Sequence, residues 1–414
     1  MRPPHVLALT LCFAALLLAC LPRPEARGAS SAPPPAVEGD ARAAARGVQS
    51  FTGRALSPVF EGSGDVVASP YSISSALHLA LLGARGETRA ELEATLGTDA
   101  AAGGHANMGA LGYALWSDAE GAPTVRVANR VWLDRAATLA PAYLDGSAAF
   151  YGAEPGALDF RGDPERSRGA INAWVSERTE AVIPELLSPG AVHGGTRAVL
   201  TNAVYFRGDW ADPFVAELTR PGDFHVPGEG PTSARFMVKE SDLLYAEAPD
   251  RQVVGLPYEG GEWTLYVVLP APGAHASVGR ELASSGFAGS LPTDTARVHL
   301  RLPRFRASWS AALREVLEEA GLNAPFDPRR ADFSGMLATR GVSFSDVIHE
   351  AVIEVDETGT VAAAATAVMM EVTTSLPPEP VVMHVDRPFF FVLHHGPTDT
   401  PFFVGRVWSP VDPG

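Results

Sequence analysis

Cysteine is nearly absent from this sequence: its 414 residues contain two, Cys12 and Cys20. Cys12 lies inside an apolar N-terminal stretch that we expect to be removed as a signal, so the mature chain keeps at most one cysteine. One cysteine cannot form an intrachain disulfide, a redox pair or a cysteine-based metal site. The sequence therefore excludes these three kinds of site.

Clustered positive charge is also lacking. The formal net charge is -16 at pH 7, and no run of Lys and Arg forms a basic stripe. Nucleic acids and anionic membranes are bound mainly through such clusters. We therefore exclude nucleic acid as a partner, and we expect membrane contact only through a lipid anchor.

A signal for domain division is missing as well. Hydrophobic residues make up 46% of the chain, which is enough for a large core. After residue 45 no Pro/Gly/Ser-rich linker or block of charge interrupts the sequence. The sequence therefore predicts one large domain over residues 46–414.

The N-terminus has the features of a secretory signal. The apolar run from Val6 to Ala19 is too short to span a bilayer, so residues 1–19 read as a signal peptide. The letters LLAC, which end at Cys20, resemble a bacterial lipoprotein box, whereas cleavage further on is the alternative. Residues 20–45 would form a Pro/Ala-rich tether. We expect secretion across the inner membrane and a lipid anchor on the cell envelope, or otherwise a periplasmic or extracellular protein.

Helical and extended patterns are both present. Apolar spacing predicts helices over Ser72–Leu82, Glu87–Leu96 and Ser308–Ala320, and Gly97 and Gly321 end the last two. Another helix is predicted to begin after Asp163, which would cap it, with Pro164 at its first position. Strands are predicted at VRVANRVWL, RAVLTNAVYF, WTLYVVLP, VHLRLPRF, VIHEAVIEV, RPFFFVLHH and PFFVGRVW. Because these elements do not alternate as βαβ units, the fold class is α+β with antiparallel or mixed sheets.

Motifs of enzymes are missing. The sequence has no HExxH, Walker loop, G-x-S-x-G elbow or dinucleotide fingerprint. His394 and His395 are neighbours in a predicted strand, so they would point to opposite faces and could not share a metal ion. We predict neither a metal nor a cofactor. A hydrolase is the least favoured function, and the chain is not expected to be an enzyme.

Seven segments in order resemble the serpin family. They begin with DVVASPYSISSALHLALLGARGETRAEL and continue with INAWVSERTEAVIPELL, VLTNAVYFRGDWADPF, LRLPRF, ADFSGM, VIHEAVIEVDETGTVAAAATAV and DRPFFFVLHHGPTDTPFFVGRVWSP. The resemblance covers residues 45 to 413. It implies the serpin fold of three β-sheets with eight or nine helices and an exposed reactive-centre loop. It also implies a suicide inhibitor of serine proteases.

The segment GTVAAAAT corresponds to the hinge of that loop. In the family the cleaved loop inserts into the main sheet as a new strand, a form of strand addition. An extended chain would place Thr360, Ala362 and Ala364 on one face, and these side chains are small and uncharged. The resemblance assigns the following hinge residues: Glu357, Gly359, Thr360, Ala362, Ala363, Ala364, Ala365 and Thr366. A serpin that binds or chaperones without inhibiting is the alternative.

Five further positions match residues that control opening of the main sheet in the family. Ser69, Ser72, Asn202 and His349 would lie under the centre of this sheet, where they could equally form an ordinary buried polar cluster. Trp210 would lie at its top, with ordinary core as the alternative. Asn129 is interpreted as structural and receives no role.

The bond that the target protease cleaves follows from spacing in the family. Counting forward from Gly359 gives Thr373 and Thr374, whereas counting back from DRPF gives Thr374 and Ser375. These residues are small and uncharged, which suits a shallow elastase-like pocket. The resemblance implies a monomer that forms a covalent acyl-enzyme complex with a serine protease. A cysteine protease is a further candidate target.

Overall fold

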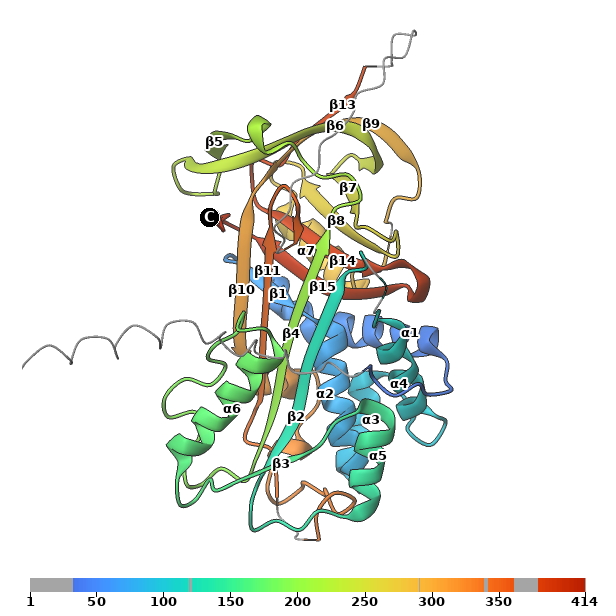
Figure 1. The fold of residues 1–414 in the computed structure, drawn as a ribbon, viewed down its shortest axis with the longest axis vertical. Coiled ribbons are helices and arrows are strands. Elements are labelled where there is room, and N and C mark those ends of the chain that lie inside the picture. Colours follow the sequence, from blue (N-terminus) through green and yellow to red (C-terminus); the bar gives the residue numbers. More distant parts are fainter. Residues whose placement is uncertain are drawn as a thin grey trace, which may run out of the picture. The chain divides into compact units, whose positions relative to one another are not determined.

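The computed structural model describes residues 33–117, 119, 121–289, 291–338, 342–360 and 379–413 (Figure 1). Most helices precede residue 179 and most strands follow it, in agreement with the α+β class predicted from the sequence. The α-helices of this part are α1 (Ala41–Phe51), α2 (Pro70–Gly83), α3 (Gly86–Leu96), α4 (Gly104–Ala114), α5 (Pro141–Tyr151), α6 (Pro164–Arg178), α7 (His275–Ser284) and α8 (Arg314–Glu319).

The strands form a 9-stranded and a 6-stranded sheet. They are β1 (Val66–Ala68), β2 (Thr124–Asp134), β3 (Gly156–Leu158), β4 (Ala198–Asp209), β5 (Arg220–Phe224), β6 (Thr232–Ala248), β7 (Arg251–Pro257), β8 (Trp263–Pro270), β9 (Thr295–Pro303), β10 (Phe305–Ala312), β11 (Val347–Val355), β12 (Gly359–Thr360), β13 (Val381–His384), β14 (Phe389–His395) and β15 (Thr400–Val407). The larger sheet has the order β1-β15-β14-β8-β7-β6-β9-β13, with β5 beside β6.

The 6-stranded sheet has the order β10-β11-β12-β4-β2-β3, and β11 also pairs directly with β4. At one end the two long strands are parallel neighbours, since Val347–Ala351 face Leu200–Val204. At the other end the short strand β12 lies between them. Among the described residues, β4 and β11 therefore pair directly with each other at the end that contains Val347–Ala351. At the opposite end β12 separates them.

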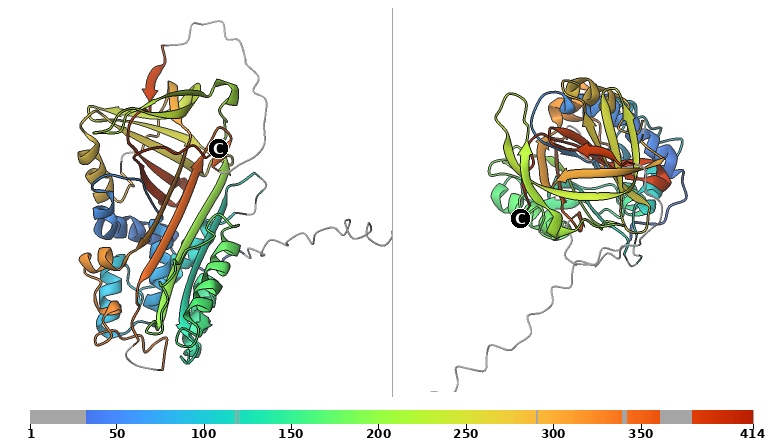
Figure 2. Two further views of the ribbon diagram at one scale, coloured as in Figure 1. Left: turned by 90° about the vertical axis from the view of Figure 1, so that its left-hand side faces the viewer. Right: turned by 90° about the horizontal axis from the view of Figure 1, so that it is seen from above.

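Helices cover both faces of the 6-stranded sheet (Figure 2). On one face α6 packs through Ile171 and Val175 against Val199 and Ala203 of β4. On the other face lies α2, a mainly apolar helix that is buried on nearly every side. A helix that is hydrophobic all round is stable only inside a core, so α2 is fixed as the layer beneath the sheet.

Three sheets were expected, whereas the strands form two. The larger sheet combines two regions that share strand β6. The first part of β6 pairs with β5 and β9, whereas Leu244–Ala248 of the same strand pair with β7. Because β6 takes part in both regions without a break, hydrogen bonding makes them one sheet.

The helix predicted over Ser308–Ala320 is present only in its second half, as α8. Residues up to Ala312 belong to β10, which pairs along its whole length with β11, and α8 begins only at Arg314. Burial alternates along β10, with Phe305 and Ala307 inside and Arg306 outside. The apolar spacing fits a helix as well as a strand, and pairing with β11 decides between them.

The predicted tether over residues 20–45 extends too far. Helix α1 begins at Ala41, and the Asp40 side chain caps it by accepting a hydrogen bond from Ala43 N at 2.9 Å. Ala44 and Ala45 are buried, and Asn107 of α4 accepts a hydrogen bond from Asp40 N at 2.8 Å. The small alanines that suggested a flexible linker allow α1 to pack closely against its neighbours.

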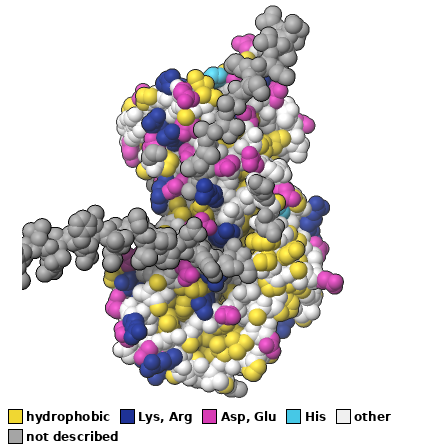
Figure 3. All heavy atoms as spheres, viewed as in Figure 1, with side chains coloured by type: hydrophobic (Ala, Val, Ile, Leu, Met, Phe, Trp, Pro, Cys, Tyr) yellow, Lys and Arg dark blue, Asp and Glu magenta, His cyan; other side chains and the backbone are white. Residues whose placement is uncertain are grey.

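Within the described ranges, no helix has the length and apolarity to cross a membrane. On the face shown in Figure 3, basic and acidic side chains are interspersed over the surface. Where this face is not covered by grey atoms, it shows no continuous basic area of the kind that binds polyanions.

Candidate functional site

The turn between β11 and β12 is organised by one aspartate. Oδ1 of Asp356 accepts hydrogen bonds from Thr358 N at 2.8 Å, from Thr358 Oγ1 at 2.7 Å and from Gly359 N at 3.1 Å. Asp356 N donates to Gly359 O at 3.0 Å. An aspartate that bonds the backbone ahead of it imitates a turn, so the chain is reversed immediately after β11.

Gly359 fits where any other residue would collide. A Cβ atom built there would lie 2.1 Å from the carbonyl oxygen of Gly208. Gly359 and Thr360 pair with Asp209 and Gly208 of β4, and Thr360 also pairs with Val355 of β11. The absence of a side chain at residue 359 thus allows the chain to enter between the two strands.

Thr360 is the last described residue of the hinge, and it is buried. Its Oγ1 lies 2.6 Å from the phenol oxygen of Tyr258. Burial raises the pKa of Tyr258 far above its usual value, so the phenol keeps its proton and can hydrogen bond to the threonine hydroxyl. This tyrosine, 102 residues away in sequence, holds the inward-facing side of the hinge.

Trp210, the residue that follows β4, contacts the same turn. Its indole Nε1 donates to Asp356 O at 2.9 Å, and its backbone N donates to Thr358 O at 2.8 Å. Its ring stacks on Tyr258 with 4.4 Å between the ring centroids. The sequence left open whether Trp210 is ordinary core. It is buried, and it also forms one wall of the hinge.

Glu357 points to the other side of the turn and is paired. Arg304 donates to its carboxylate from Nε at 2.8 Å and from Nη2 at 2.6 Å, and the Thr219 hydroxyl donates as well. Although burial alone raises the pKa of Glu357, the hydrogen bonds from Arg304 and Thr219 lower it below its usual value. A buried carboxylate held in this way fixes the end of β11.

A buried polar network lies beneath the centre of the 6-stranded sheet. We define it as the buried residues Ser69, Ser72, Asn202 and His349, together with the half-buried Asn129. Ser69 N donates to His349 Nε2 at 3.2 Å, and the other ring nitrogen contacts Asn202 Oδ1. The Asn202 amide donates to Ser72 Oγ. The structure thus brings together the four residues that the sequence placed under the sheet, from α2 and its N-cap, from β4 and from β11.

Asn129 is the member that sequence analysis missed. It lies opposite Asn202 in the β2–β4 pairing, accepts a hydrogen bond from the Asn202 amide, and donates to Ser72 O at 3.2 Å. A signal was present, because Asn129 occupies the same alternate positions of its strand as Val125, Val127 and Val131. A polar residue on an apolar face of a strand indicates a partner inside the core.

The hydrogen bonds determine the protonation of His349. Because Nε2 accepts from Ser69 N, the proton of the neutral ring is on Nδ1, which donates to Asn202 Oδ1. Complete burial lowers the pKa of His349 to about 3. His349 and Asn202 are also paired residues of β11 and β4, so their bond joins the two strands at the centre of the sheet.

Acid should therefore weaken this network. An unfolded histidine titrates near 6.5, so between pH 6.5 and about 3 the unfolded chain binds a proton that folded His349 does not. The stabilisation is complete above pH 6.5 and is lost as the pH falls. Between pH 7.5 and 5, wild type should lose about 2 kcal/mol more unfolding free energy than His349→Gln. Denaturant titrations at several pH values measure this difference, and parallel curves for the two proteins would contradict it.

Several predicted site residues lie outside the described part of the chain. These are Cys20, the hinge residues Ala362, Ala363, Ala364, Ala365 and Thr366, and the bond candidates Thr373, Thr374 and Ser375. Among the described residues, no group of three or more His, Cys, Asp and Glu side chains could hold a metal ion. His394 and His395 have separate partners, Asp399 at 2.9 Å and Thr398 at 2.7 Å.

Comparison with known proteins gives one consistent result. The family profile described as Serpin (serine protease inhibitor) matches residues 48–410. Leukocyte elastase inhibitor A of Mus musculus is 34% identical over 358 residues, 84% of this chain and 94% of that protein. An uncharacterized serpin-like protein of Thermococcus kodakarensis is 33% identical over 380 residues, 91% of this chain and 88% of that protein.

Solved structures agree on the fold. The native stressed conformation of an Arabidopsis serpin matches with a TM-score of 0.79 and 26% identity, over 90% of this chain and 99% of that chain. A highly specific serpin of the insect Tenebrio molitor matches with a TM-score of 0.79 and 27% identity, over 88% of this chain and 98% of that chain. The expected serpin fold is confirmed, and the chain belongs to the serpin family of serine protease inhibitors.

Proposed function

We propose that this protein is a suicide inhibitor that traps a serine protease by inserting its cleaved loop into the 6-stranded sheet. One observation carries the proposal: Gly359 and Thr360 are already paired between β4 and β11, with Thr360 buried. A strand that has begun to enter can continue in the same direction, because each further residue gains partners on both sides.

The target protease carries out the cleavage of the loop. Its serine oxygen attacks the carbonyl carbon of Thr373, the peptide bond to Thr374 breaks, and the Thr374 amine leaves as a new N-terminus. The bond between Thr374 and Ser375 is the alternative. The ester joins the protease to the loop until water hydrolyses it. About 14 inserted residues at ~3.3 Å each would move the attached protease by roughly 46 Å.

Insertion has to part β4 from β11. The pairing of Val347–Ala351 with Leu200–Val204 must open, and with it the bond between His349 and Asn202. These hydrogen bonds are replaced by bonds to the incoming strand, whose alternate positions after Thr360 are the small residues Ala362 and Ala364. We infer that the buried polar network sets how readily this happens.

An elastase-like target suits the loop best. The residues at the candidate bonds are small and uncharged, which fits a shallow specificity pocket. Similarity to leukocyte elastase inhibitors supports the same choice. We propose that the inhibitor acts as a monomer, without a cofactor, and that a cysteine protease is a second candidate target.

A panel of purified proteases tests this function. We expect the elastase-like members to form complexes that survive boiling in detergent, with mass equal to the protease plus the cleaved serpin. Cleavage without a complex would instead indicate a serpin that only binds or chaperones. Turnover of a peptide substrate by the protein itself would indicate a hydrolase.

We also propose that the protein is bacterial, secreted, and anchored to the cell envelope through a lipid on Cys20. The motivation is the apolar run that ends in LLAC. Cys20→Ala should release the protein from membranes into the soluble fraction, whereas Cys12→Ala, inside the proposed signal, should leave its distribution unchanged. Cell fractionation and the mass of the N-terminal peptide measure this. Soluble wild-type protein without a lipid mass would contradict the anchor and favour a periplasmic or extracellular protein.

A further inference from the structure

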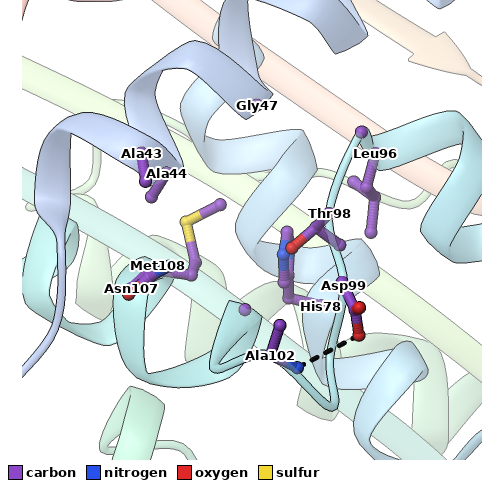
Figure 4. A pocket seen from close by; sticks show the side chains of 12 residues that line it. Ala43, Ala44, Gly47, His78, Leu96, Thr98, Asp99, Ala102, Asn107 and Met108 are labelled. Carbon is purple, nitrogen blue, oxygen red and sulfur yellow. Dashed lines mark hydrogen bonds between the residues drawn. The ribbon is translucent and has the colours of Figure 1, made fainter.

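A cavity of 240 Å³ lies between α1, α4 and the loop that joins α3 to α4 (Figure 4). Small residues leave this space open, since α1 contributes Ala43, Ala44 and Gly47. Leu96 and Met108 supply larger apolar surface. An apolar cavity of about 150 Å³ binds benzene, so this one can hold a substituted aromatic ring.

His78 of α2 presents an unused acceptor to this cavity. Its side chain lines the cavity although the residue is only 3% exposed. Nδ1 lies 2.8 Å from Ser74 O, and a carbonyl oxygen can only accept, so Nδ1 carries the proton. Burial lowers the pKa of His78 to about 3, and in the neutral ring Nε2 is then an acceptor.

No described residue donates a hydrogen bond to Nε2 of His78. The neighbouring ring of His105, 6.1 Å away between centroids, bonds through Nδ1 to the phenol oxygen of Tyr151 instead. The described atoms that are both wholly buried and unpartnered do not include Nε2 of His78, so this nitrogen reaches the open space of the cavity. The cavity therefore favours an occupant that brings a hydroxyl or N–H group.

Asp99 adds negative charge at the edge of the same cavity. Its Oδ1 accepts hydrogen bonds from Ala101 N at 2.8 Å and Ala102 N at 3.1 Å. Its Oδ2 forms no hydrogen bond or ion pair with the described residues, and the side chain is exposed. A carboxylate in this position favours a cationic group on the ligand.

We propose that this cavity binds a small arylalkylamine that also carries a hydroxyl or N–H donor. The ring packs between α1 and Met108, the donor bonds His78 Nε2, and the ammonium group lies against Asp99. The site is separate from the hinge and the buried polar network. The inference therefore goes beyond the proposed function, and its test needs no protease.

Calorimetric titration of the purified protein with three related compounds tests the proposal. Tyramine has both polar groups, phenethylamine lacks the hydroxyl, and 4-ethylphenol lacks the amine. We expect tyramine to bind, and each of the others to bind about tenfold more weakly because one hydrogen bond or ion pair is lost. Equal binding of all three, or no heat from tyramine at millimolar concentration, would overturn the proposal.

Two variants locate the binding. Ala43→Leu fills the cavity from α1 and should abolish tyramine binding. Asp99→Asn keeps the Oδ1 acceptor for the loop while removing the charge, so it should weaken tyramine about tenfold and leave 4-ethylphenol unchanged. Thermal unfolding checks that both variants are folded. If Ala43→Leu does not fold, Asp99→Asn still tests the site, because residue 99 is exposed and its substitution should not disturb the core. Wild-type affinity for tyramine in the folded variants would refute the site.

Discussion

Thr360→Arg is expected to convert the protein from an inhibitor into a substrate. Thr360 is wholly buried against Tyr258, so an arginine there forces a charge into the buried space where the threonine hydroxyl now meets a neutral phenol. Burying an unpaired charge costs several kcal/mol. Strand insertion should stall, and the protease should hydrolyse its acyl bond first. The moles of serpin consumed per mole of elastase-like protease inhibited should rise at least about tenfold, since ~1.4 kcal/mol changes the ratio of two rates by that factor.

The matched control is Val361→Arg. In an extended strand the next residue faces the opposite side, so its arginine would lie on the face away from Tyr258 and should change the stoichiometry much less. Neither substitution alters the residues near the cleaved bond, so the initial rate of cleavage should be similar for both. Equal loss of inhibition in the two variants would contradict the prediction that residues 360 and 361 face opposite sides of the inserted strand. Stoichiometric inhibition by Thr360→Arg would remove strand insertion as the mechanism.

The second large effect is expected from the buried polar network. His349→Ala and Asn202→Ala each leave former partners buried without a hydrogen bond, which costs about 1 to 3 kcal/mol. If these bonds break before β4 and β11 separate, the barrier to opening falls by a similar amount, and opening accelerates about 5- to 150-fold. At mildly raised temperature both variants should form loop-sheet oligomers sooner than wild type, as measured by size-exclusion chromatography.

Ser74→Ala is the control for this experiment. Ser74 is buried in the same helix as Ser72, but its hydroxyl has no hydrogen-bond partner among the described residues. Its removal should leave the rate of oligomer formation near that of wild type. If His349→Ala and Asn202→Ala also stay monomeric and fully inhibitory, the network does not control sheet opening.

Local signals in the sequence predicted local structure well. The Asp163 side chain caps α6 with Pro164 at its first position, and Gly97 ends α3 in the left-handed conformation, as expected. These features depend on residues a few positions apart, so the sequence contains all that they require. The prediction failed at Ser308–Ala312, where the partner strand β11 begins 35 residues later.

The candidate site could be predicted only in part, for a related reason. The resemblance to serpins supplied Thr360, Glu357 and the four residues under the sheet. It did not reveal Tyr258 or Arg304, which contact the hinge from positions 102 and 53 residues away. Such contacts are set by how the sheets pack, and no periodicity in a single sequence encodes them.

The contacts of the hinge turn have a consequence for how the sequence can vary. Trp210 and Phe214 bind the turn through the carbonyl oxygens of residues 356, 357 and 358, which every amino acid possesses. Mutational drift at Thr358 would therefore leave these bonds in place. Glu357 and Thr360 bind through their side chains to Arg304 and Tyr258, so a change at either has to be matched by a change in its partner. Among divergent relatives we expect these two pairs to covary.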